Sequence, residues 1–149
     1  MPAALRKTDE VKTMLFPALA QMLTEVEQDD SVWADTTDED ESLAKDPANT
    51  AVSVIGRISN DLGEKTTLAS CQPLIGQMVK SENWVERQAG YTLLGLISEA
   101  CKDSLLKNMD EAMKMACAGM VDANVRVRYA GLTAIALLLT ELAPKAQNQ

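Results

Sequence analysis

Residues 83–101 read NWVERQAGYTLLGLISEAC, and residues 124–142 read NVRVRYAGLTAIALLLTEL. The two stretches align without a gap at an offset of 41, which places Arg87 on Arg128 and Gly90 on Gly131. In both, apolar residues recur at steps of three, four and seven, and this spacing puts their side chains on one face of an α-helix. The chain therefore repeats a helical unit.

Four further stretches have the same helical spacing, and no convincing alternation of period two indicates a strand. They lie near residues 11–26, 51–62, 68–78 and 106–120. The segment FPALAQM, from Phe16, also parallels QPLIGQM, from Gln72. Two helices in a period of about 40 residues are typical of HEAT and armadillo arrays. We predict an all-α protein, an α-α superhelix of the HEAT-repeat type with three helix pairs.

The two parallel segments FPALAQM and QPLIGQM are 56 residues apart, about 16 more than the period. The extra residues fall between the first and second helices, where a charged stretch of sequence lies. We therefore predict an acidic, structureless loop over 28–47, inserted into the turn of the first pair. The predicted repeats cover 3–63, 65–103 and 105–145 of a single array.

The negative charge of the chain is concentrated in this insertion. From Glu25 to Asp46 there are ten acidic residues and one basic residue, which leaves twelve acidic and thirteen basic residues elsewhere. A local anionic field attracts basic partners and repels nucleic acid and anionic membrane surfaces. The sequence therefore predicts a basic protein partner and neither nucleic-acid nor membrane binding.

The composition argues against an enzyme. The sequence has no histidine, the commonest general base and metal ligand. Cys71, Cys101 and Cys117 do not have the spacing of a zinc site, and we expect all three to be small buried hydrophobes. We expect no catalytic residue, metal or cofactor. The N-terminal residues MPAALRKTDEVK lack a secretory signal, so we expect a soluble intracellular protein.

Several residues of the repeat have predicted structural roles. Asn83 and Asn124 stand where helix N-caps are needed. Asp122 precedes Arg128 in the spacing of a recurrent HEAT pairing, whereas Ser81 replaces the aspartate before Arg87. We predict that Asp122, Arg87 and Arg128 tie one repeat to the next. We also predict close helix packing at Gly90 and Gly131.

The segments SENWVERQAG and VRVRYAGLTAIALL resemble second helices of HEAT repeats in the importin-β (karyopherin-β) superfamily. In that family, one central repeat has an acidic loop that usually ends near a tryptophan. Here EQDDSVWADTTDEDESLAKD carries Trp33 and then the run Asp38 to Glu41. Because the acidic run continues past the tryptophan, it looks most like the importin-β3 branch.

The resemblance implies a segment of a nuclear transport receptor that shuttles between cytoplasm and nucleus. Members of the family bind protein cargo and GTP-bound Ran on the concave side, which is formed by the second helices. The resemblance implies that the acidic loop meets lysines and arginines of Ran or of a localisation signal, and that Trp33 anchors the loop. The implied partner-binding residues are Asp35, Asp38, Glu39, Asp40 and Glu41, and the cargo-facing candidates are Trp84, Gln88 and Tyr91.

Three helix pairs are few for this family, and the N-terminal repeats that supply most of the family's Ran surface are missing. The chain is therefore either a central fragment or a truncated paralogue, and we expect its apolar end faces to self-associate end to end. One alternative is a HEAT scaffold for another complex, such as a phosphatase scaffold, with no transport role. In another, the loop merely keeps the chain soluble. Cargo identity and the direction of transport stay open.

Overall fold

The computed structural model describes residues 10–35 and 46–146, and these ranges form helices without a strand. The all-α prediction is therefore confirmed. None of the described helices is both long and apolar enough to cross a bilayer. The elements are η1 (Val11–Leu15, a π-helical turn), α2 (Phe16–Met22), α3 (Asp30–Asp35), α4 (Pro47–Leu62), α5 (Glu64–Met78), α6 (Trp84–Leu96), α7 (Lys102–Lys107), α8 (Met109–Met120) and α9 (Val125–Ala146).

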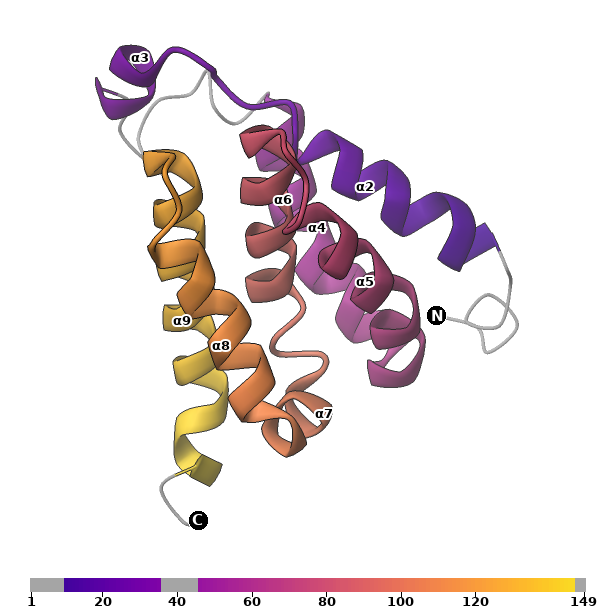
Figure 1. Ribbon diagram of the computed structural model, residues 1–149. Coiled ribbons are helices and arrows are strands. Elements are labelled where there is room, and N and C mark those ends of the chain that lie inside the picture. Colours follow the sequence, from indigo (N-terminus) through magenta and orange to yellow (C-terminus); the bar gives the residue numbers. More distant parts are fainter. Residues whose placement is uncertain (1–9, 36–45, 147–149) are drawn as a thin grey trace.

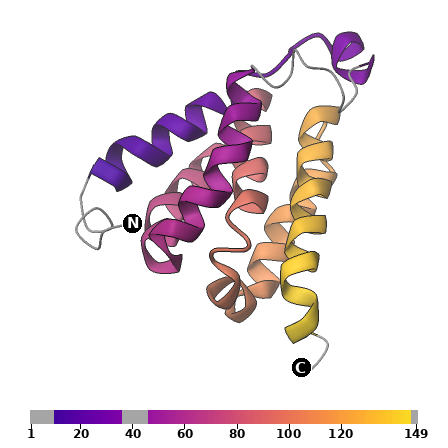
Figure 2. The same cartoon turned by 180° about the vertical axis from the view of Figure 1, so that it is seen from behind.

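The longer helices form three pairs, α2 with α4, α5 with α6, and α8 with α9 (Figure 1). The second helix of the middle pair, α6, packs against both α4 and α9, and α2 packs against α5. The pairs are therefore stacked side by side. Figure 2 shows the array from behind, with α4 and α9 nearest to the viewer.

The core confirms the predicted stripes of the second helices in the last two pairs. These two stripes are buried along their whole length, at Ala89, Leu93, Ile97, Cys101, Ala130, Ala134, Leu138 and Leu142. They meet because α6 and α9 pack along each other.

The apolar stripe predicted near 106–120 is wrong, because it does not coincide with the residues that are buried there. A break at Asn108 separates α7 from α8, so the spacing that begins at Leu106 does not continue into α8. Cys117 and Met120 are exposed, and α8 buries Ala112, Ala116 and Gly119 instead. The expectation that all three cysteines are buried is therefore wrong for Cys117.

Glycines allow the close packing of the helices. A Cβ atom added at Gly131 would lie 2.9 Å from the carbonyl carbon of Gly119, and one added at Gly90 would lie 2.9 Å from the Cβ of Met78. Both positions join a second helix to the first helix of its own pair. Gly95 has a different role, because its added Cβ would lie 3.2 Å from the Cα of Ala134 on the next second helix.

Short caps begin the second helices of the last two pairs. The Oδ1 of Asn83 accepts a hydrogen bond from the amide of Val85 at 3.1 Å, and that of Asn124 accepts one from the amide of Arg126 at 2.8 Å. These bonds satisfy amides that have no partner in the first helical turn. The predicted N-caps are confirmed, and they fix where α6 and α9 start.

Candidate functional site

A groove runs along the layer of second helices. It has a volume of about 510 Å³ and is lined by α4, α6 and α9, with the segment before α4 at one end. Its walls combine apolar side chains, such as Val52, Leu96 and Leu137, with the uncharged polar side chains of Asn49 and Thr133. Such a mixture of apolar surface and a few polar groups is typical of sites that receive another molecule.

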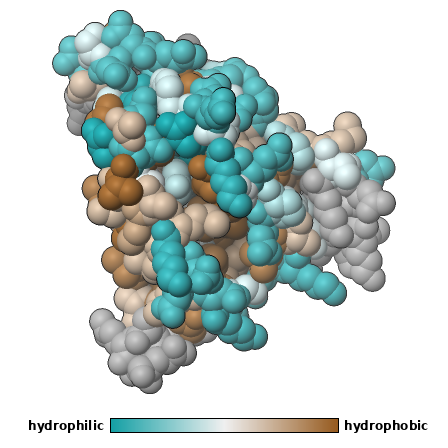
Figure 3. Space-filling model, viewed as in Figure 1, coloured by the Kyte–Doolittle hydropathy of each residue, from teal (hydrophilic) through white to brown (hydrophobic). Residues whose placement is uncertain are grey.

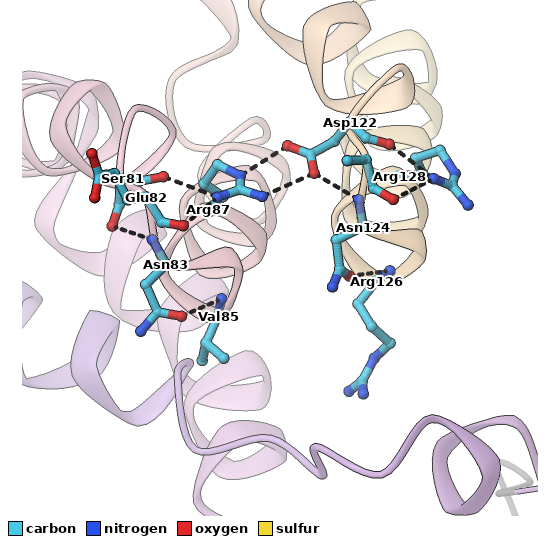
Figure 4. A network of polar contacts seen from close by, with 10 residues as sticks. Ser81, Glu82, Asn83, Val85, Arg87, Asp122, Asn124, Arg126 and Arg128 are labelled. Carbon is cyan, nitrogen blue, oxygen red and sulfur yellow. Dashed lines mark hydrogen bonds and ion pairs between the residues drawn. The ribbon is translucent and has the colours of Figure 1, made fainter.

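Arg126 lies at one end of this groove, in the first turn of α9. Although it is charged, it is only 6 % exposed. Its Nη1 donates to the carbonyl oxygen of Glu27 and lies 3.8 Å from Oδ1 of Asp30. Burial lowers the pKa of the guanidinium, while Asp30 and Glu27 oppose this shift. Figure 4 shows the side chain pointing from α9 toward the segment that leads into α3.

Two tryptophan rings accompany the Arg126 guanidinium. Its central carbon lies 4.5 Å from the ring centroid of Trp33 and 5.4 Å from that of Trp84, both within the range of a cation–π interaction. The ring of Trp33 also meets Tyr129 edge to face, with centroids 5.5 Å apart and planes at 81°. Residues from α3, α6 and α9 therefore converge on one buried charge.

The sequence predicts that the acidic stretch is structureless. This is wrong for its first part, because α3 forms there. The Oδ1 of Asp29 accepts hydrogen bonds from the amide and hydroxyl of Ser31, at 2.9 and 2.6 Å. These bonds lower the pKa of Asp29, and the bond from the Ser31 hydroxyl has the largest effect. A carboxylate in this position caps a helix start. The local sequence DDS therefore supplies its own helix signal, which the high charge conceals.

The predicted partner-binding residues divide between two parts of the chain. Asp35 is exposed at the end of α3. Asp38, Glu39, Asp40 and Glu41 lie outside the described residues. The structure adds Glu27 and Asp30, which lie beside Arg126 but are not among the predicted partner-binding residues. Their signal in the sequence is the acidic EQDD at 27–30, three residues before Trp33.

The expectation that Gln88 and Tyr91 are exposed is wrong, because both are buried. Their contact with cargo stays a prediction, and Gln88 does line the groove. The amide nitrogen of Gln88 donates to the carbonyl oxygen of Leu23 at 2.8 Å and so joins α6 to the end of α2. Tyr91 packs with Val127 and Ala130 of α9. Burial raises the pKa of the Tyr91 phenol. Helix α6 has neighbours on several sides, so little of its surface stays exposed.

The residues of the predicted structural ladder make a related but different set of contacts (Figure 4). The carboxylate of Asp122 binds Arg87 of the preceding pair and not Arg128. Each arginine also donates to two carbonyl groups of the turn before its own helix: Arg87 to Ser81 and Glu82, and Arg128 to Asp122 and Ala123. Although Ser81 replaces an aspartate, its carbonyl group still binds Arg87.

Within the described ranges, no cluster of three or more Asp, Glu, Cys or His side chains is arranged to hold a metal ion. The arrangement near Arg126 offers apolar, aromatic and acidic surface, which suits the recognition of another chain.

None of the protein-family models compared with this chain matches it. The chain is 28 % identical over 132 residues to importin subunit beta-3 of Saccharomyces cerevisiae, a match that covers 85 % of this chain and 12 % of that protein. It superposes on the crystal structure of Kap121p with a TM-score of 0.86 and 23 % identity, covering 97 % of this chain and 14 % of that one.

Two structures of Kap121p complexes also match at 23 % identity, and each match again covers 97 % of this chain and 14 % of Kap121p. Kap121p bound to RanGTP matches with a TM-score of 0.86, and Kap121p bound to Pho4p with 0.87. The predicted HEAT-repeat fold and the resemblance to the importin-β superfamily are confirmed. The chain spans a small part of these relatives.

Proposed function

We propose, from the similarity of this chain to a segment of importin subunit beta-3, that it is part of a nuclear transport receptor and shuttles between cytoplasm and nucleus. In this proposal the groove of α4, α6 and α9 and the acidic stretch beside it receive basic protein cargo and GTP-bound Ran. The predicted repeats 3–63, 65–103 and 105–145 belong to the same proposal, and the pairing of the helices supports them.

One observation carries the proposal. An acidic segment is anchored by Trp33 and Arg126 at the end of a groove whose walls are otherwise uncharged. Carboxylates at the edge of such a groove attract lysine and arginine side chains, and the apolar walls hold the rest of a peptide. The complexes of Kap121p with RanGTP and with Pho4p, in the same fold, are consistent with these partners.

The test replaces Asp38, Glu39, Asp40 and Glu41 with Asn or Gln in the full chain. Binding is measured by fluorescence anisotropy with a labelled lysine-rich signal peptide and, separately, with GTP-loaded Ran. We expect weaker binding, with the loss largest at low salt, because exposed charges are screened as the ionic strength rises.

A control variant neutralises the same number of exposed carboxylates elsewhere, at Glu10, Asp61, Glu99 and Asp110. This control should bind as the unchanged chain does. Equal losses in both variants would indicate an effect of net charge alone. If the unchanged chain binds neither partner at low salt, the transport proposal fails, and a scaffold without a transport role becomes the better interpretation.

A further inference from the structure

Helix α3 is attached to the rest of the array by few contacts. None of its six residues, all of them described, is buried. A helix of this length is unstable in water by itself, because its few hydrogen bonds do not offset the cost of nucleation. The position of α3 therefore depends on the contacts that the segment Glu27–Trp33 makes with Arg126 and Tyr129.

The receiving surface for α3 is better fixed than α3 itself. Arg126 projects from α9, and besides its contacts with the segment Glu27–Trp33 its guanidinium lies over Trp84 of α6. The Asn124 cap holds the first turn of α9, from which Arg126 projects. These two contacts do not involve α3, so they remain when α3 leaves the groove.

Trp33 closes one end of the groove. Its ring belongs to the lining at the end where Arg126 and Tyr129 lie. A partner that extends past this end of the groove onto the Arg126 guanidinium must therefore displace Trp33 from it. Displacement would also free Asp30 from its contact with Arg126 and leave its carboxylate available to the partner.

We propose that α3 is a latch: Trp33 stacked on Arg126 covers one end of the groove, and a partner opens the latch by placing its own aromatic side chain there. The inference rests on the proposed function. The partner's group at this point is aromatic and not basic, because Arg126 repels a second cation and attracts the face of a ring. Basic residues of the partner flank that aromatic group and meet Asp30 and its acidic neighbours.

The test uses two labelled peptides, one with a central phenylalanine flanked by lysine pairs and one with alanine in place of the phenylalanine. We expect the phenylalanine peptide to bind the full chain more tightly. Trp33→Ala should raise the affinity for the phenylalanine peptide about threefold to tenfold. A site that is open for only a fraction of the time binds its ligand more weakly in proportion to that fraction, and this variant leaves the site open. Val32→Ala, a half-exposed neighbour in α3, serves as the control and should keep the original affinity.

The latch is also observed directly through fluorescence. The chain has two tryptophans, so Trp84→Phe leaves Trp33 as the single reporter and keeps a ring over Arg126. The phenylalanine peptide should shift the emission of Trp33 to longer wavelength, toward that of the same variant carrying Arg126→Gln. Unchanged circular dichroism checks that the array stays folded.

The outcomes separate the two proposals. If the peptide binds but the emission of Trp33 stays unchanged, or Trp33→Ala weakens binding, Trp33 is not a latch, while partner binding by the groove stands. If the alanine peptide binds as tightly as the phenylalanine peptide, the aromatic requirement fails and the latch proposal with it. If neither peptide, nor GTP-loaded Ran, binds any variant, both proposals fail together.

Discussion

Arg87 and Asp122 are 35 positions apart in the sequence and form a two-pronged ion pair, with Nε–Oδ2 at 2.8 Å and Nη2–Oδ1 at 3.0 Å. The pair joins the first turn of α6 to the turn between α8 and α9. The same guanidinium donates to the carbonyl oxygens of Ser81 and Glu82. One arginine therefore fixes its own turn and holds the next helix pair against it.

Replacing Asp122 with Asn should lower the free energy of unfolding by about 1–3 kcal/mol, because a charge-assisted bidentate contact becomes a weaker neutral one. The two side chains are only 20 % and 14 % exposed, so water replaces the lost contact poorly. Urea unfolding followed by circular dichroism measures the change.

The chain offers a matched control for this ion pair. Lys114 and Glu111 also form an ion pair, at 3.3 Å, but their side chains are 74 % and 78 % exposed. Exposed pairs contribute little, so Glu111→Gln should change the free energy of unfolding by less than about 0.5 kcal/mol. If both variants lose the same amount, the ion pair of Arg87 is not a special link between the helix pairs.

The stability of the array should also depend on the ionisation of Asp122. Its hydrogen bonds with Arg87 hold the pKa of this carboxyl below its usual range. The unfolded chain takes up this proton more readily than the folded chain does. The stability that ionised Asp122 contributes is therefore present above the ordinary aspartate pKa, and it is lost as the pH falls through the lower pKa of the folded state. The difference in unfolding free energy between the unchanged chain and Asp122→Asn should therefore shrink as the pH falls from 6 toward 3. A difference that stays constant over this range would contradict the assignment.

Gly131→Ala should destabilise the array by about 1–3 kcal/mol, because overpacking a tight contact forces the backbone apart. The added Cβ would lie 2.9 Å from the carbonyl carbon of Gly119 and 3.0 Å from the amide nitrogen of Met120, and backbone atoms move less easily than the end of a side chain. Gly76→Ala is the control, since an added Cβ there meets nothing within 4 Å. Alanine favours a helix over glycine, so Gly76→Ala should keep or raise the melting temperature.

Much of the fold could be predicted from the sequence because second helices repeat their packing. Ile97 and Leu138 are equivalent at the offset of 41 and are both almost fully buried, so the stripes on which they lie are long and regular. The first helices are harder to predict. The break at Asn108 shifts the buried face of α8, and the small residues that it buries, such as Ala116, carry a weak hydrophobic signal.

The candidate site could be predicted only in part, because its contacts join distant residues. Glu27 and Arg126 are 99 positions apart, and no local pattern reveals that they meet. The helical spacing does not show that Gln88 faces α2, because this depends on how the pairs stack. What the sequence does indicate is the acidic stretch and its tryptophan, and Trp33 stays a predicted anchor whose ring stacks on Arg126.

The outward side of α9 bears on the expectation of self-association. Val125, Tyr129, Leu132 and Leu139 are between 41 % and 60 % exposed and follow one another at steps of three, four and seven. Figure 3 shows hydrophobic side chains along the edge of the molecule where α9 runs, whereas hydrophilic ones cover α3 and part of α8. An apolar stripe of this kind favours association in water, because its burial against a second copy releases ordered solvent.

Leu132→Glu should therefore reduce association in sedimentation velocity experiments at increasing protein concentration. A carboxylate at the centre of the stripe would have to be buried without a partner, and that cost opposes the contact. Asn60→Glu, at an exposed position of α4, adds the same charge away from α9 and should leave association unchanged. The stripe is the relevant surface only if the two variants differ. A clean monomer of the unchanged chain at high concentration would show that its apolar faces do not associate end to end.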